Sequence, residues 1–297
     1  MKKFTQLLFM LSIMMVALNL NTRQSSAGCE DPETLVFSII PTEESIQELT
    51  IYKPVIDYLG RMTGKKIEFY VPIYYENVIQ GMAEKWIDVA ILGPYSYVIA
   101  NKKEPDIQVF ATYIKKAGYI QEEGPGYKSI LITEKGSGYV SIKSLKGAIV
   151  GLTNLSSTSG YLIPKVLFAK YINMPFEKYF GKIVYTGGHD LSAMAIYDGR
   201  IDAAFVATHR FDNAINRGII KKDDYNYLWS SPIIPQDPFC YRNSLCPELK
   251  KKIIDTFLTL HTQSSCSQFL IDINAKGFVE MNSEDYDVIR ELEQKIE

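Results

Sequence analysis

The chain has 297 residues, 46% of them hydrophobic, and a formal net charge of −2 at pH 7. The length allows two lobes of the usual ~100 to 150 residues each. A weakly acidic chain of this kind is not suited to nucleic acid or to an anionic membrane surface, so neither is expected as a direct partner. An anionic ligand would have to be held by local dipoles.

Residues 1–27 have the pattern of a secretory signal peptide. Two lysines precede an apolar run from Leu7 to Leu18, which only Ser12 interrupts. The run is shorter than the about 20 apolar residues that a membrane-spanning helix needs. We therefore expect an exported protein located in the periplasm.

The end of this signal leaves two alternatives open. Small residues at 25–27 suit ordinary cleavage after Ala27, whereas Cys29 is a candidate site for lipidation. Ser26 stands where bacterial lipoprotein signals usually carry leucine, which favours ordinary cleavage. A lipidated Cys29 would hold the protein at the outer face of the membrane.

Short runs rich in β-branched and aromatic residues alternate with helix-like segments along the chain. The first helix is predicted at residues 46–62, where apolar residues recur at helical spacing. Strands are predicted at residues 35–40, 67–71, 87–92, 107–113, 129–133, 148–152, 182–186 and 201–208. This alternation implies an α/β fold with parallel sheets that helices cover.

Two segments have the composition of connections between lobes. Residues 117–126 are rich in Gly and charge, and residues 230–238 contain three prolines and form a return crossing. We expect a discontinuous first lobe at 30–117 plus 238–297 and a second lobe at 118–237. The polar C-terminal helix, residues 285–297, is expected to pack on the first lobe.

The strongest local signal for a binding site is NLSSTSGY, which stands between a predicted strand and an apolar helical run. A helix start leaves backbone N–H groups unpaired and carries about half a positive charge. Ser157, Thr158 and Ser159 are therefore predicted to form a cradle for an anion. The alternative is that one of these hydroxyls simply caps the helix.

Two further junctions between strand and helix carry polar residues. His189 follows two glycines and opens a helix, so its imidazole is predicted to donate to the same anion. The alternative is a structural histidine at a helix start. Ser96, in GPYSY, is a weaker candidate, because a Gly-Pro turn that caps a helix explains this motif equally well.

The chain has four cysteines, and disulfides persist in an oxidising compartment. Cys240 and Cys246 are the predicted pair, because they straddle a turn. The alternative is two buried thiols. If Cys29 is not acylated, it could pair with Cys266.

Taken together, these motifs resemble the periplasmic phosphonate-, phosphite- and phosphate-binding proteins of ABC importers. The resemblance covers nearly the whole mature chain and includes FSIIPTEE, YYENVIQGMAEKWIDVAILGPYSYV, PGYKSILIT, SSTSGYLIP, GGHD, DGRIDAAF and SPIIPQDPF. It implies a two-lobed type II periplasmic binding protein, in which each lobe is a mostly parallel sheet flanked by helices and two crossings join the lobes. It also implies a monomer that uses no cofactor or metal and delivers its ligand to an ABC transporter permease.

By the same resemblance, Tyr75 from the first lobe and Tyr127, just past the first crossing, would bind the phosphorus oxygens together with the hydroxyl cradle and His189. The chain departs from the family where members that take aminoalkylphosphonates place a carboxylate for the ligand's ammonium. Here His209 stands in that stretch without an acid, and Asp237 remains as a candidate partner. Since an ammonium buried without a partner costs several kcal/mol, 2-aminoethylphosphonate is disfavoured. Phosphate, phosphite and methylphosphonate are the preferred ligands, and His209 is expected to add a donor or a positive charge.

The alternatives are an enzyme, a sensor subunit and a binding protein for another oxyanion. An enzyme is disfavoured because GxSxG, HExxH and a recognisable nucleophilic cysteine are all absent from the sequence. A sensor subunit that presents its ligand to a membrane receptor kinase would share the fold and the site, so it remains an alternative. Arsenite and selenate also remain as alternative ligands.

Overall fold

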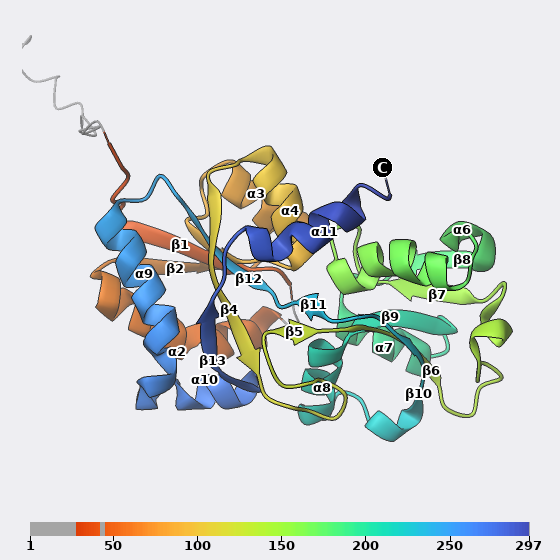
Figure 1. The fold of residues 1–297 in the computed structure, drawn as a ribbon. Helices are drawn as coiled ribbons and strands as arrows, with labels where there is room; N and C mark the ends of the chain where they lie inside the picture. The colour runs from red at the N-terminus through yellow and green to blue at the C-terminus, as the bar shows by residue number, and fades with distance from the viewer. Residues whose placement is uncertain (1–27, 42–44, 297) are drawn as a thin grey trace, which may run out of the picture.

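The computed structural model describes residues 28–41 and 45–296, and the side chains of residues 45–47 are not described. The predicted signal peptide lies outside these residues. Two lobes stand side by side, each built on one sheet (Figure 1). Within the described part of the chain, no helix has the length and apolarity to cross a membrane.

The first lobe contains a six-stranded sheet in the order β13-β4-β12-β3-β1-β2. Its strands are β1 (Thr34–Ile39), β2 (Lys66–Tyr70), β3 (Val89–Ile91), β4 (Ile107–Lys115), β12 (Pro238–Arg242) and β13 (Ala275–Glu280). Its helices are α2 (Ser45–Thr63), α3 (Tyr75–Ala83), α4 (Pro94–Lys103), α9 (Pro247–Thr259), α10 (Ser267–Asp272) and α11 (Asp287–Glu293). The predicted first helix is confirmed, and it ends before Gly64, whose φ of 71° suits a residue without a side chain.

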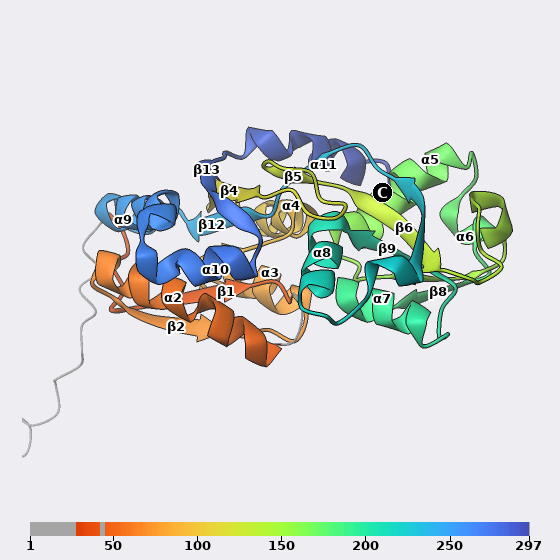
Figure 2. The same cartoon turned by 90° about the horizontal axis from the view of Figure 1, so that it is seen from below.

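The second lobe contains a five-stranded sheet in the order β10-β6-β9-β7-β8. Its strands are β6 (Ser129–Glu134), β7 (Ile149–Leu152), β8 (Lys182–Tyr185), β9 (Ala203–Ala207) and β10 (Tyr225–Ser230). Its helical segments include the π-helical turns η2 (Thr158–Leu162) and η3 (Pro164–Phe168), followed by α5 (Ala169–Tyr171), α6 (Phe176–Tyr179), α7 (His189–Tyr197) and α8 (Thr208–Asn216). Figure 2 shows α7 and α8 on the same side of this lobe.

The predicted α/β class is confirmed, and both sheets are mixed, with more antiparallel pairs than the mostly parallel sheets that were expected. In the first sheet, β12 and β13 run antiparallel to their neighbours, and in the second sheet β6 runs antiparallel to β9 and β10. The reason is the connectivity, because β12 enters the first sheet from the return crossing and not from a helical crossover. The spacing of apolar residues in the sequence does not reveal whether neighbouring strands run parallel or antiparallel.

The chain crosses between the sheets twice. The first crossing contains β5 (Gly126–Tyr127), the return crossing contains β11 (Ile234–Pro235), and the two segments pair as a short antiparallel ladder. The lobe limits suggested above, 30–117 plus 238–297 and 118–237, stay a prediction. Helix α11 packs on α4, as expected, and also contacts η2 of the other lobe.

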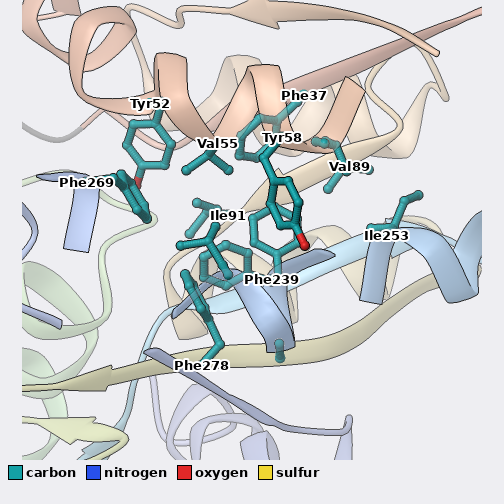
Figure 3. Packing of buried hydrophobic residues seen from close by; sticks show 14 of the residues in the cluster. Phe37, Tyr52, Val55, Tyr58, Val89, Ile91, Phe239, Ile253, Phe269 and Phe278 are labelled. Atoms are coloured by element: carbon teal, nitrogen blue, oxygen red, sulfur yellow. The ribbon is translucent and has the colours of Figure 1, made fainter. Parts of the chain in front are cut away.

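Aromatic side chains dominate the core of the first lobe. Figure 3 shows Tyr52 and Val55 of α2 facing Phe37 and Phe239 of the sheet. The ring of Phe239 lies 4.9 Å from that of Phe257 in α9, measured between centroids. Burial of each such side chain stabilises the fold by roughly 1.5 to 3 kcal/mol, so this sheet is a rigid support for the site described below.

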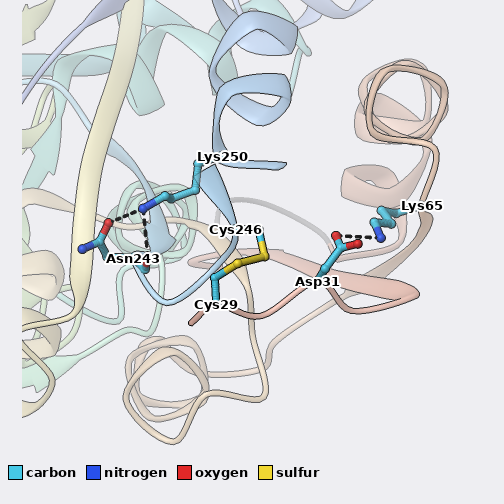
Figure 4. The surroundings of a disulfide bond; sticks show 6 residues. All are labelled: Cys29, Asp31, Lys65, Asn243, Cys246 and Lys250. Atoms are coloured by element: carbon cyan, nitrogen blue, oxygen red, sulfur yellow. Dashed lines mark hydrogen bonds and ion pairs between the residues drawn. A yellow bond between two sulfur atoms is a disulfide. The ribbon is translucent and has the colours of Figure 1, made fainter. Parts of the chain in front are cut away.

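A disulfide joins Cys29 to Cys246, which are 217 positions apart in the sequence (Figure 4). The predicted Cys240–Cys246 pair and the alternative Cys29–Cys266 pair are both wrong. Cys240 is fully buried within β12, and Cys266 is fully buried in the first lobe, where its Sγ donates to the carbonyl of Pro54. With its sulfur in this bond, Cys29 has no thiol left for a lipid thioether.

The backbone next to Cys29 explains the pairing. Glu30 forms an isolated bridge with Leu245, its N–H donates to the Ser244 carbonyl over 2.8 Å, and its carbonyl accepts from the Cys246 N–H over 2.8 Å. The Glu30 side chain also pairs with Arg242 over 2.8 Å. These contacts hold the two cysteines within reach of each other.

Candidate functional site

A small cavity lies where the two lobes meet. In this arrangement it has room for roughly one water molecule, so a larger ligand would require its walls to move apart. Both lobes and the crossings supply its lining: Ile40, Tyr75, Gly93, Tyr127, Ser157, Thr158, Ser159, His189, Ala207, His209, Arg210 and Asp237. Of the predicted site residues, only Ser96 is absent from this lining.

The three hydroxyl residues of the predicted cradle lie together at the start of η2. All three are buried, with at most 2% of their surface exposed. Ser157 caps the helical turn, because its Oγ accepts from the N–H of Gly160 over 3.1 Å. Capping uses a lone pair and leaves the hydroxyl proton for a ligand, so the two interpretations of Ser157 are compatible.

Gly160 holds the cradle close to the sheet. A Cβ atom at this position would lie 2.1 Å from the Oγ1 of Thr153, and the Gly160 carbonyl accepts from the Thr153 N–H over 3.1 Å. Only a residue without a side chain permits this approach. Thr153, at the end of β7, therefore links the cradle to the neighbouring histidine.

His189 opens α7, and the hydrogen bonds of its ring fix its tautomer. The Nδ1 atom accepts from the backbone N–H of Ala207 over 3.2 Å and also lies 3.2 Å from the Thr153 hydroxyl. Because a backbone N–H can only donate, the proton of the neutral ring lies on Nε2. Burial lowers the pKa of His189 to about 3. The side chain thus offers the cavity one neutral N–H donor.

Tyr75, the first residue of α3, and Tyr127, in β5, line the cavity from opposite sides of the junction. Both side chains are buried, and burial raises the pKa of each phenol far above its ordinary value. Each tyrosine therefore keeps its O–H at physiological pH. Together with the cradle and His189, they form a wall of neutral hydrogen-bond donors.

The remaining part of the lining carries charge. Arg210 in α8 donates from its guanidinium to a carboxylate oxygen of Asp237 over 2.9 Å. Burial raises the pKa of this carboxyl, but the neighbouring His209, Arg210 and Lys115 together hold it at about 2. His209 faces the same carboxylate at 3.7 Å, which is beyond hydrogen-bonding distance.

Hydrogen bonds also join the two lobes around the cavity. The Tyr95 N–H donates to Oγ1 of Thr158 over 2.8 Å. Ser96 is not among the described residues that line the cavity. Its Oγ donates to the Ser156 carbonyl over 2.8 Å. Glu76 of α3 accepts from the Ser156 hydroxyl over 3.2 Å. The structure is therefore a state in which the lobes are closed on each other.

Sequence reasoning missed Arg210 and Thr153. It expected local dipoles to hold the anion, although Arg210 directly follows His209 in the sequence. A signal was present, because α8 begins at Thr208 and its first turn follows the buried strand β9. The first turn of a helix at the end of a central strand is a common position for ligand-binding residues.

Comparisons with known proteins agree on one family. Residues 37–286 match the family described as "ABC transporter, phosphonate, periplasmic substrate-binding protein". The phosphate-import protein PhnD of Mycolicibacterium smegmatis is 28% identical over 91% of this chain and 88% of its own length. The phosphonates-binding periplasmic protein of Escherichia coli is 31% identical over 81% of this chain and 70% of its own length.

A solved structure also resembles this fold closely. A binding protein component of an ABC phosphonate transporter from Pseudomonas aeruginosa superposes with a TM-score of 0.80 and 27% identity, over 89% of this chain and 86% of its own. PhnD1 from Prochlorococcus marinus, solved in complex with methylphosphonate, has a TM-score of 0.77 at 21% identity, covering 90% of this chain and 99% of its own. At that identity the second likeness concerns the fold alone.

Proposed function

Because the chain belongs to the family of periplasmic substrate-binding proteins of ABC phosphonate transporters, we propose that it binds a small phosphorus oxyanion and delivers it to an ABC transporter permease. The observation that carries the proposal is the convergence of the hydroxyl cradle, His189 and two tyrosines on one cavity. The cradle, His189 and the two tyrosines come from four different elements, so a tetrahedral anion can meet several donors at once. Ligand class and permease both remain proposals.

The number of donors supports useful affinity. Hydrogen bonds to a charged ligand contribute about 1.5 to 3 kcal/mol each, so several of them reach the roughly −8 to −11 kcal/mol of micromolar to sub-micromolar binding. Arg210 also lines the cavity, where its charge is paired with that of Asp237. Because the ligand would contact both lobes, its binding would stabilise the closed state, and a permease that recognises closure would detect occupancy.

The Arg210–Asp237 pair supports a ligand without an amine. Asp237 is the carboxylate in the lining, and it is 2% exposed and already bound to Arg210. An incoming ammonium would have to displace this guanidinium, which would leave Arg210 without its carboxylate partner. Phosphate, phosphite and methylphosphonate therefore remain the proposed ligands, and 2-aminoethylphosphonate is disfavoured.

Calorimetry with these four compounds tests the proposal. We expect at least one of the three small anions to bind with micromolar or tighter affinity, with the aminoethyl compound weakest. Tightest binding by the aminoethyl compound would show that the interpretation of Asp237 is wrong, and absence of binding by all four would contradict the proposed ligand class. Membrane vesicles that contain the cognate permease would separate import from the alternative role as a sensor subunit.

A further inference from the structure

His209 has an environment that packing alone does not explain. The side chain is 4% exposed and lines the cavity, yet neither ring nitrogen has a hydrogen-bond partner among the described residues. The ring contacts Tyr127 edge to face, with centroids 4.7 Å apart. A buried polar group that lacks a partner costs about 1 to 3 kcal/mol, so two such nitrogens beside a cavity indicate a partner that arrives with the ligand.

The charged groups around His209 determine whether the partner of its ring must donate or accept a hydrogen bond. Asp237 approaches from the return crossing, Arg210 lies on the same helix, and the buried cation Lys115 of β4 contributes to the field there. Burial and the nearby cations keep His209 neutral, with a pKa lowered to about 3. A neutral imidazole has one accepting nitrogen, and the ionised Asp237 has only acceptor oxygens.

The cavity therefore has two chemically different sides. The cradle, His189 and the two tyrosines supply donors to the cavity, whereas His209 and Asp237 supply acceptors, with the His209 ring next to that of Tyr127. An oxyanion without hydrogen would satisfy the donors but would leave the accepting nitrogen of His209 unsatisfied and place its charge near the Asp237 carboxylate. An oxyanion that keeps one O–H would satisfy both sides.

We propose that His209 and Asp237 form an acceptor subsite that takes the hydroxyl proton of a hydrogen oxyanion, so that hydrogen phosphate is the preferred ligand. This inference rests on the proposed function and narrows it from phosphorus oxyanions in general to phosphate. The recognised feature is the P–O–H group, which methylphosphonate and phosphite lack as dianions. Sulfate and selenate lack an O–H as well.

Monofluorophosphate is the direct probe, because it replaces this hydroxyl with fluorine and leaves the shape and the charge of the dianion nearly unchanged. Calorimetry is performed with the full mature protein in mildly alkaline buffer, where both compounds are dianions. We expect phosphate to bind about 10- to 100-fold more tightly than monofluorophosphate, the effect of one hydrogen bond to a charged acceptor. Equal affinities would overturn the inference.

Two variants test whether His209 and Asp237 cause the difference in affinity between phosphate and monofluorophosphate. His209→Phe removes both nitrogens and keeps a ring, and Asp237→Asn replaces an acceptor oxygen with an amide that can donate. Each variant is expected to bring the affinity for phosphate close to the affinity for monofluorophosphate, so that their ratio falls towards one. The control, His261→Phe at an exposed histidine of the first lobe, leaves this ratio unchanged. A merely structural role would weaken both compounds equally and keep the ratio.

The outcomes also separate this inference from the function on which it rests. Tighter binding of methylphosphonate or phosphite than of phosphate would overturn the acceptor subsite and leave the proposed function intact. Absence of binding by every oxyanion would overturn both. A ratio that stays at the wild-type value in both variants would contradict the assignment to His209 and Asp237.

Discussion

The Oγ1 atom of Thr158 accepts a hydrogen bond of 2.8 Å from the backbone N–H of Tyr95. Tyr95 belongs to α4 of the first lobe, whereas Thr158 begins η2 of the second lobe. Thr158 therefore has two tasks, because its lone pair joins the lobes and its proton remains for a ligand. Lobe closure and ligand binding share one hydroxyl group.

Thr158→Ala is expected to weaken phosphate binding by roughly 1 to 3 kcal/mol, because it removes the donor to the ligand and leaves the Tyr95 N–H without its acceptor. Thr158→Ser keeps the oxygen and should bind within a few-fold of the wild type. Calorimetry measures both. An alanine variant that binds as tightly as the wild type would remove Thr158 from the site.

His189→Gln and His189→Asn separate the two nitrogens of this histidine. The glutamine amide reaches towards the position of Nε2 and can donate to the ligand, whereas the asparagine amide is shorter and lies nearer to Nδ1. We expect the glutamine variant to retain more affinity, by about 3- to 10-fold. A reversed order in a fluorescence or calorimetric titration would mean that Nδ1 faces the ligand.

Glu76→Ala tests the contacts between lobes outside the cavity lining. Glu76 is exposed and accepts hydrogen bonds from Ser156 and Asn154 of the second lobe. Because exposed contacts contribute little, we expect a loss of only about 2- to 5-fold, expressed as faster ligand dissociation in stopped-flow experiments. Glu84→Ala, at another exposed position of the same lobe, is the control. A change in the association rate alone would contradict this role.

Acidification is expected to destabilise the protein well before its carboxylates are protonated. His189 and His209 have pKa values lowered to about 3, while the unfolded chain takes up these protons below the ordinary value of 6.5. The free energy of unfolding therefore falls as the pH decreases from 6.5 to about 3, by up to about 1.4 kcal/mol per pH unit for each histidine.

Urea unfolding at several pH values measures this slope. His209→Phe should show a shallower slope than the wild type, since one of the two titrating groups is gone. His261→Phe serves as the matched substitution at an exposed histidine. Identical slopes for the wild type and the His209 variant would contradict the lowered pKa.

The Cys29–Cys246 disulfide closes a very long loop, so its removal should be costly. With a sequence separation of 217 between the cysteines, the entropy of the unfolded chain predicts a loss of about 3 to 5 kcal/mol in the Cys29→Ser and Cys246→Ser double variant. Thermal unfolding with and without a reductant checks this value. Peptide mapping should find residues 29 and 246 in one cross-linked fragment, and a fragment that links 240 to 246 would contradict the structure.

The sequence predicted the elements, the hydroxyl cradle and His189, because these depend on local order, whereas Tyr75 and Tyr127 followed only from the resemblance to the family. A hydroxyl run after a strand identified Ser157 and its neighbours, and two glycines before His189 marked a helix start. Contacts between distant segments were not accessible in this way. Arg210 meets Asp237 only because the return crossing passes in front of α8, and Cys29 meets Cys246 only because Glu30 bridges to Leu245.

The opposite charges of Arg210 and Asp237 cancel inside the cavity, and the whole chain carries a formal charge of only −2. Capture of an anion therefore depends on short contacts made after water has left, and hardly on attraction over a distance that dissolved ions would screen. Binding by such short contacts is expected to change little between low and high ionic strength.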